Sequence, residues 1–136
     1  MTSKRYAKQR ALLAICLLVW TGALVATHIP ASKIPPIGAS DKLLHVLGYF
    51  LLASIFWLTL KGYDVKRFMR LACVLSGLIA YGVFDELTQP IFNRRASIYD
   101  WLADVAGTII AVIIMETALF IIQRRRASSS TTRHGG

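Results

Sequence analysis

The sequence predicts an all-α membrane protein whose four transmembrane helices form a bundle with both termini in the cytoplasm. Three observations lead to this fold class. Hydrophobic residues make up 55% of the 136 residues and charged residues only 17%, whereas soluble domains carry about a quarter charged residues. Four apolar stretches are each long enough to cross a hydrocarbon core of roughly 30 Å. The basic residues lie beside alternate ends of these stretches.

The four predicted helices span residues 11–29, 43–60, 68–88 and 98–122. Basic residues precede the first stretch as in a signal peptide, but its apolar run is too long and lacks a cleavage site of small residues. We therefore interpret it as an uncleaved helix. Ser40 or Asp41 is expected to cap the second helix, and Pro90 to end the third. Ser97 and Asp100 resemble a capping box, which starts the fourth helix directly after Ser97.

The positions of Lys and Arg predict the orientation. The N-terminal tail (residues 1–10), the connection between the second and third helices, and the C-terminal tail (residues 123–136) carry four each, and the other two connections share the remaining four of sixteen. The positive-inside rule therefore places both tails in the cytoplasm. The C-terminal tail is expected to be disordered, because it has no large apolar residues to bury after Arg126. The basic residues that flank the membrane helices account for the net charge of +9, so no nucleic-acid partner is expected.

Most acidic residues are predicted to gather at the helix ends that face away from the cytoplasm. His45, Asp85 and Asp104 lie roughly 22 to 30 Å along their helices from the basic residues at the opposite ends. They therefore share one layer, in the outer leaflet. Ionisable groups at membrane depth cost roughly 2.5–3.5 kcal/mol each on insertion scales, so such a layer is a candidate functional site. The candidate ligand-binding residues are Asp41, Lys42, His45, Tyr81, Asp85, Glu86, Gln89, Arg94, Arg95, Asp100 and Asp104.

Helical spacing indicates that these polar residues belong to the interior face. On the fourth helix, Asp100 and Asp104 continue at the same spacing into Gly107. Small residues at such spacing let transmembrane helices approach closely, and Ser76 with Ala80 is expected to do the same on the third helix. The charged stripe should therefore face the other helices.

The remaining polar and aromatic residues have structural interpretations. Cys16 and Cys73 lie in apolar helix and are assigned to packing. No spacing is typical of a metal site or a redox pair, so neither a metal ion nor another cofactor is expected. Glu116 lies within the fourth helix and is expected to pair with another helix or to snorkel. The tryptophans are interpreted as interfacial or lipid-facing side chains, namely Trp20, Trp57 and Trp101.

Three motifs occur in order on consecutive predicted helices. Asp-Lys-x-x-His begins at Asp41, and Tyr-x-x-x-Asp-Glu-x-x-Gln begins at Tyr81. Arg-x-x-Ser-x-x-Asp-x-x-x-Asp-x-x-Gly begins at Arg94, with Arg95 as the alternative arginine. Over residues 41–115 this order resembles the VanZ-like family of small bacterial membrane proteins. The resemblance implies a four-helix, multi-pass protein of the bacterial cytoplasmic (inner) membrane with no settled catalytic activity. The family is named after an accessory factor in glycopeptide resistance.

Two departures from the family pattern affect the site. The family more often has Asn at the position of Asp104, and it has Pro-Gly before its arginine where this chain has Asn93. Either Arg94 or Arg95 therefore fills the family role, and the resistance phenotype is not carried over to this chain.

Three classes of function remain open. The working hypothesis is a module that binds or handles an anionic envelope lipid or cell-wall precursor, in which arginines grip phosphate or carboxylate. The first alternative is an intramembrane enzyme acting on a lipid-linked phosphate. Its candidate acid–base residues are His45, Asp85 and Glu86, with a divalent ion as a helper. The second alternative is a structural polar network within a membrane complex. The bilayer is the expected partner in each case, and the oligomeric state stays open.

Overall fold

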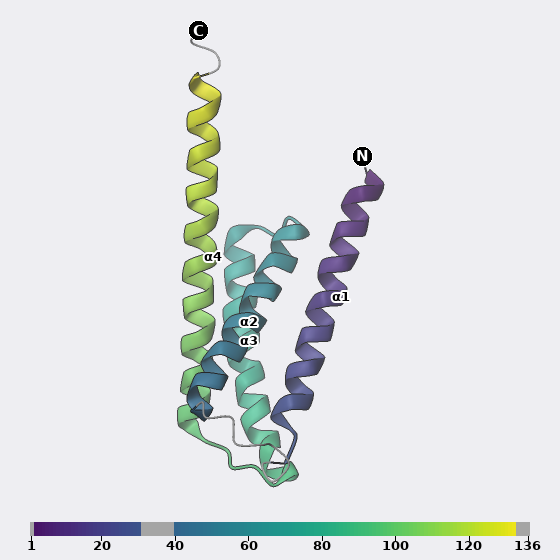
Figure 1. The fold of residues 1–136 in the computed structure, drawn as a ribbon, viewed down its shortest axis with the longest axis vertical. Helices are drawn as coiled ribbons and strands as arrows, with labels where there is room; N and C mark the ends of the chain where they lie inside the picture. Colours follow the sequence, from purple (N-terminus) through teal and green to yellow (C-terminus); the bar gives the residue numbers. More distant parts are fainter. Residues whose placement is uncertain (1, 31–39, 133–136) are drawn as a thin grey trace.

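A computed structural model describes residues 2–30 and 40–132, and all regular structure within these ranges is helical. The elements are α1 (Thr2–Thr27), α2 (Asp41–Gly62), α3 (Arg67–Thr88), the short 3₁₀ helix η2 (Gln89–Phe92) and α4 (Ile98–Thr132). The four long helices run side by side, with both chain ends at the same end of the bundle (Figure 1). We call this the terminal end, and we call the opposite end, where η2 lies, the distal end.

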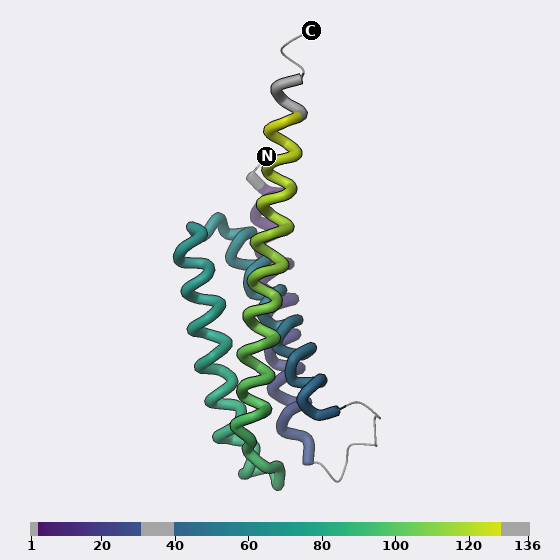
Figure 2. Tube along the Cα trace, turned by 90° about the vertical axis from the view of Figure 1, so that its left-hand side faces the viewer, coloured from purple at the N-terminus to yellow at the C-terminus, as the bar shows by residue number. Residues whose placement is uncertain are grey.

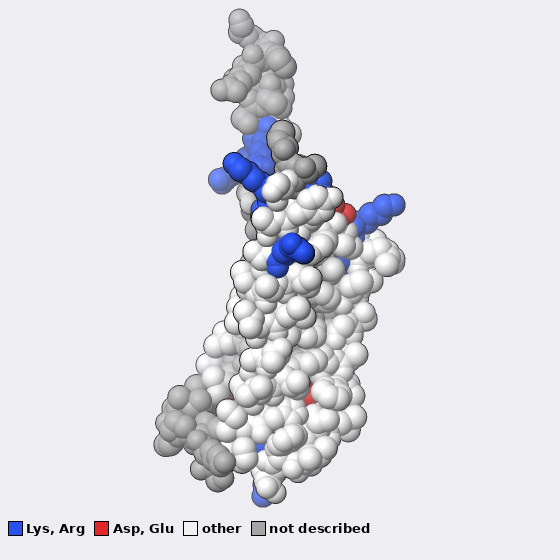
Figure 3. Space-filling model, turned by 90° about the vertical axis from the view of Figure 1, so that its right-hand side faces the viewer, with Lys and Arg blue, Asp and Glu red and all other residues white. Residues whose placement is uncertain are grey.

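Each long helix contains a stretch that is long and apolar enough to cross a membrane. The surface of the bundle agrees, because large apolar side chains such as Leu18, Phe68 and Leu87 are 72%, 79% and 72% exposed. Soluble monomers rarely expose contiguous apolar patches of more than a few hundred Å². Lys and Arg side chains gather toward the terminal end, beside a broad uncharged surface (Figure 3). The described helices thus have the architecture of a multi-pass membrane protein.

The interior of the bundle is rich in polar side chains. Leu52, Val74 and Leu78 are buried at its centre. The fully buried side chains also include four polar ones, Asp85, Gln89, Asp104 and Thr108. This distribution reverses that of soluble proteins, in which acidic residues are almost never fully buried unless paired. A hydrocarbon solvent offers no water to polar groups, so such groups generally turn toward neighbouring helices.

α2 and α4 form the most extensive helix pair among the described elements, and their backbones approach closely at Gly107. A Cβ atom on Gly107 would lie 2.3 Å from the carbonyl oxygen of Val46. Ala111, one turn further along α4, is completely buried. The small-residue stripe predicted for the fourth helix is therefore confirmed, and it holds the backbones of α2 and α4 together beside Asp104.

The packing face predicted for the third helix is wrong. Ser76 and Ala80 are exposed, and the Ser76 hydroxyl donates to the carbonyl of Ala72 within its own helix. The buried face of α3 instead presents Val74 and Leu78 to the core. The spacing of Ser76 and Ala80 shows that they share a face of α3, but it does not identify that face as the interior one.

On the distal side the Ser40 cap and the predicted boundaries of α3 and α4 are confirmed, whereas α1 ends at Thr27 and α2 begins at Asp41, each two residues from its predicted boundary. Ser40 caps α2, and its hydroxyl accepts a hydrogen bond from the Leu43 N–H at 3.2 Å. α3 ends at Thr88, shortly before Pro90, because proline has no N–H to continue the α-helical hydrogen bonds, and the chain goes on as the 3₁₀ helix η2. The fourth helix begins at Ile98.

Two helices continue beyond their predicted ends on the terminal side. α1 begins at Thr2 rather than near residue 11, and Gln9 Nε2 donates to the Gly62 carbonyl at 3.0 Å. α4 continues to Thr132, well past the other helices (Figure 2). The tail through Thr132 is therefore helical and not disordered, and residues 133–136 lie outside the described residues. Gln, Arg and Ala are strong helix formers, which accounts for the extension.

Glu116 pairs with another helix, as expected. Its carboxylate accepts hydrogen bonds from Arg70 Nη2 at 2.9 Å and from Arg67 Nε at 2.8 Å, both from α3. It also accepts one from Trp57 Nε1 at 2.9 Å. The Arg70 guanidinium lies 4.5 Å from the centre of the Trp57 ring. Trp57 is 3% exposed, so its interpretation as an interfacial side chain is wrong, because Glu116 and Arg70 hold it inside the bundle.

Candidate functional site

A histidine and an aspartate from different helices meet in the interior near the distal end. Nδ1 of His45 on α2 lies 2.8 Å from Oδ1 of Asp104 on α4. The two side chains are 6% and 1% exposed. The close packing at Gly107 allows this contact, because Gly107 lies one helical turn beyond Asp104. The carboxyl group thereby orients the imidazole, because a hydrogen bond at one ring nitrogen fixes the position of the ring.

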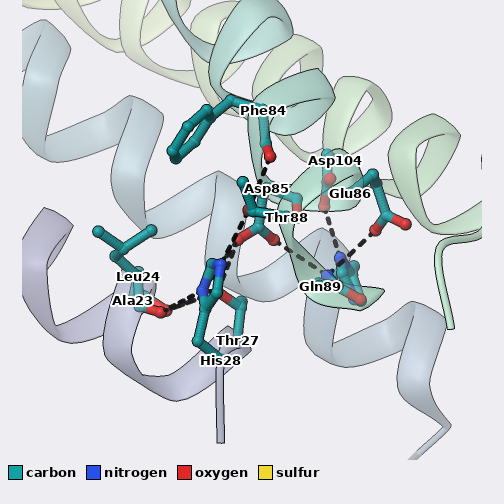
Figure 4. A network of polar contacts seen from close by, with 11 residues as sticks. Ala23, Leu24, Thr27, His28, Phe84, Asp85, Glu86, Thr88, Gln89 and Asp104 are labelled. Atoms are coloured by element: carbon teal, nitrogen blue, oxygen red, sulfur yellow. Dashed lines mark hydrogen bonds and ion pairs between the residues drawn. The ribbon is translucent and has the colours of Figure 1, made fainter. Parts of the chain in front are cut away.

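The distal end of α3 and the first residue of η2 supply a connected group of three polar side chains. The amide nitrogen of Gln89 donates to Asp85 Oδ2 at 3.2 Å and to Glu86 Oε1 at 3.3 Å. The spacing of three and four residues along a helix places these side chains on one face. All three are buried, with Asp85 at 0% exposure. The group faces Asp104 across the interior (Figure 4).

The first helix contributes two residues that sequence reasoning did not assign to the site. The Thr27 hydroxyl donates to Asp85 Oδ1 at 2.6 Å. His28 Nδ1 lies 3.8 Å from the same oxygen, and its Nε2 lies 2.8 Å from the Thr88 hydroxyl. Both residues point from the end of α1 toward α3 (Figure 4). The signal available in the sequence was a polar Thr-His pair at the distal end of an otherwise apolar stretch.

Glu86 also fixes the start of the fourth helix. Its Oε2 accepts a hydrogen bond from the Ser97 N–H at 2.6 Å. In the predicted capping box, the side chain of Asp100 would accept from this N–H. That part of the prediction is wrong, because the buried carboxylate of Glu86 occupies the position. Glu86 thus ties the loop after η2 to the polar interior.

The charged residues at the distal surface form a looser rim around the buried groups. Arg94 Nη2 lies 3.7 Å from Asp41 Oδ1, and Lys42 Nζ lies 3.9 Å from Asp100 Oδ1. Both distances exceed hydrogen-bond length, so the guanidinium and ammonium donors stay available. Arg95 is exposed, and within the described ranges its guanidinium makes no ion pair. The structure therefore brings Arg94, and not Arg95, against an acidic member of the predicted site.

Tyr81 lies deeper in the bundle than the rest of the predicted site. Its ring packs 4.9 Å from Trp20 and 6.0 Å from Tyr49, measured between ring centres. The hydroxyls of Tyr81 and Tyr49 are buried and have no hydrogen-bond partner among the described residues. These tyrosines form the floor of the cluster, toward the apolar core.

A groove opens beside the cluster between α3 and the start of α4. It encloses about 330 Å³ and is lined by Val83, Glu86, Leu87, Ala96, Ser97, Ile98 and Trp101. Binding pockets for small molecules generally begin at about 300 Å³. Glu86 is its one charged lining residue, and the walls are mostly apolar. The groove thus connects an apolar surface with the buried polar groups.

Two sets of residues bring metal-ligand atoms close together. The ligand atoms of His45, Glu86 and Asp104 lie within 4.8 Å of one another, and all three side chains are buried. A second set, made of Asp41, His45 and Asp100, meets the same limit, but Asp41 is exposed. The chemistry available to the buried set is cation binding or acid–base exchange between imidazole and carboxylate.

The fold and site define a multi-pass helical membrane protein with a buried polar cluster at one end. In comparisons with known proteins, no family model, no curated protein and no solved structure matches the chain. The resemblance to the VanZ-like family therefore stays a prediction.

Proposed function

We propose that this chain is a VanZ-like protein of the bacterial cytoplasmic membrane that binds an anionic envelope lipid or cell-wall precursor at its distal end. Both termini lie in the cytoplasm, because twelve of the sixteen basic residues flank the terminal end. The distal end then lies at the outer leaflet. Its ligand enters sideways from the bilayer.

The observation that carries the proposal is an apolar groove at the distal end, beside the buried polar cluster. Leu87 and Ile98, which line the groove, are 72% and 62% exposed, so the groove opens on the surface that faces lipid. The loop that forms its other wall carries two arginines immediately before Ala96. An amphiphile placed here has its chain against apolar side chains and its anionic group within reach of guanidinium donors.

Arg94 is the arginine that we assign to the anion. Its side chain is 14% exposed and is held at the rim by Asp41. A planar guanidinium that is partly ordered before binding forms bidentate hydrogen bonds to phosphate or carboxylate, which a lysine ammonium does not reproduce. Arg95, one residue along and exposed, is the matched control.

Native mass spectrometry of the detergent-solubilised protein tests the proposal. The probes are phosphatidylglycerol, a polyprenyl phosphate and zwitterionic phosphatidylcholine. We expect the wild type to retain one of the two anionic lipids, and the preferred one identifies the source of the anion. Charge-assisted hydrogen bonds contribute about 1.5–3 kcal/mol each, so Arg94→Lys and Arg94→Ala should both weaken retention by about tenfold or more.

The controls separate ligand binding from charge balance. Arg95→Lys, and Arg124→Ala near the terminal end, should retain the lipid as the wild type does. Rescue of retention by Arg94→Lys would reject the guanidinium clamp. Equal retention of phosphatidylcholine and both anionic lipids would reject the proposed function and favour a structural polar network.

A further inference from the structure

Three helices each contribute one buried ligand atom to a common point beneath the distal rim. His45 comes from α2, Glu86 from α3 and Asp104 from α4, and their ligand atoms all lie within 4.8 Å of one another. Ligands around a divalent ion at about 2.0–2.2 Å lie about 3 Å apart when adjacent and about 4 Å apart when opposite. The 2.8 Å separation of His45 Nδ1 from Asp104 Oδ1 is thus already that of two adjacent ligands. Small side-chain movements bring the carboxylate of Glu86, the third ligand, to the same distance from the other two.

The charge balance of the cluster favours a cation at this point. Four carboxylates are buried at the distal end, those of Asp85, Glu86, Asp100 and Asp104. Among the described residues, the Lys and Arg side chains nearest to the cluster are at its rim, where they approach acidic oxygens no closer than 3.7 Å. Buried carboxylates that lie together require a proton or a cation between them. Among the described residues Lys42 pairs only with Asp100, and a divalent ion supplies two positive charges to Glu86 and Asp104.

A second, independent observation concerns Asp104. The Asp104 side chain is only 1% exposed. Its Oδ2 is buried and has no hydrogen-bond partner among the described residues. This oxygen faces α3, because a Cβ on Gly82 would lie 3.3 Å from it, and Gly82 lies one turn before Glu86. An unpaired buried carboxylate oxygen costs several kcal/mol unless a ligand satisfies it.

We propose that His45, Glu86 and Asp104 bind a divalent transition-metal ion, Zn²⁺ or Mn²⁺. One imidazole nitrogen and two carboxylate oxygens suit these ions, whereas Mg²⁺ and Ca²⁺ prefer ligand sets made of oxygen alone. Three protein ligands leave at least one coordination position for an outside oxygen. The assignment of that position to the phosphate or carboxylate of the bound amphiphile rests on the proposed function. The ion site itself does not.

Metal analysis of the purified protein tests the site. The protein is purified through a tag other than polyhistidine, treated with EDTA, and titrated with Zn²⁺ or Mn²⁺ alone, without added lipid. We expect one ion per chain by elemental mass spectrometry and a rise in the melting temperature with ion concentration. Glu86→Gln and Asp104→Asn should weaken binding by about 100-fold or more, because loss of an outer hydrogen-bond partner alone costs about 10–100-fold.

The control is Asp64→Asn, which alters an exposed carboxylate between α2 and α3, outside the cluster. It should keep the ion. Absence of stoichiometric ion in the folded wild type, or equal uptake by the wild type and both ligand variants, would overturn the proposal and leave a shared proton as the counter-charge. Lipid retention measured with and without the ion distinguishes the two proposals. Ion binding without lipid retention would refute the proposed function alone, whereas lipid retention without ion binding would refute the ion site alone.

Discussion

Replacing Gly107 with alanine should force α2 and α4 apart and break the contact that forms the centre of the candidate site. The added Cβ would lie 2.3 Å from the carbonyl oxygen of Val46, whereas ordinary contacts begin at 3.4 Å. The nearest atoms of α2 are backbone, so no side-chain rotation relieves the clash. The helices must separate by about 1 Å, and overpacking of this kind typically costs about 1–3 kcal/mol.

The same movement has a consequence for the site. The His45–Asp104 contact, one turn away, is 2.8 Å long, and lengthening it by about 1 Å takes it beyond hydrogen-bond distance. The assay is thermal unfolding of the purified protein in detergent, followed by circular dichroism. Gly48→Ala on α2 is the matched control, because no atom lies within 4 Å of the Cβ it would add. Equal melting temperatures for Gly107→Ala and Gly48→Ala would refute the close approach of α2 and α4.

Two further predictions concern the terminal end and the orientation. Glu116→Ala should destabilise the protein by about 3–5 kcal/mol, because it leaves Arg70, 3% exposed, as an unpaired buried charge. Arg67→Ala should cost less than about 1 kcal/mol, since Arg67 is 74% exposed, and equal melting temperatures for the two variants would contradict this difference. In a cysteine-free background, a cysteine at Ala96 should react with an impermeant maleimide on intact cells and one at Ser128 should not. The reverse labelling pattern would invert the proposed topology.

The helices could be predicted because their signals are local. Long apolar runs, the Ser40 cap and Pro90 act through the backbone of their own segment, and the boundaries predicted at the distal end lie within two residues of those in the structure. Helical rise alone places His45 and Asp104 in one layer, and they are in contact. Gly107 could be predicted as a packing position because small residues continued the charged stripe.

The errors occur where the choice of neighbour decides the outcome. Thr27 and His28 end an apolar stretch that has no acidic residue of its own, and only the packing of α1 near α3 brings them to Asp85. Tryptophan is common at membrane interfaces, but Trp57 is buried by partners on two other helices. The Ser97 cap was predicted as a local motif, yet its N–H pairs with Glu86 from another helix. Periodicity shows which residues share a face and not which helix that face meets.

The central claim is that the distal groove holds an anionic amphiphile, and photo-crosslinking in membranes tests it most directly. A diazirine amino acid at Ala96, which lines the groove, is compared with one at Ala80, which is exposed on α3 and does not line the groove. The lipids captured at each position are identified by mass spectrometry. We predict that one anionic lipid dominates at Ala96, several-fold above its share in the membrane, while capture at Ala80 follows the bulk composition. The same bulk composition at both positions would contradict the claim.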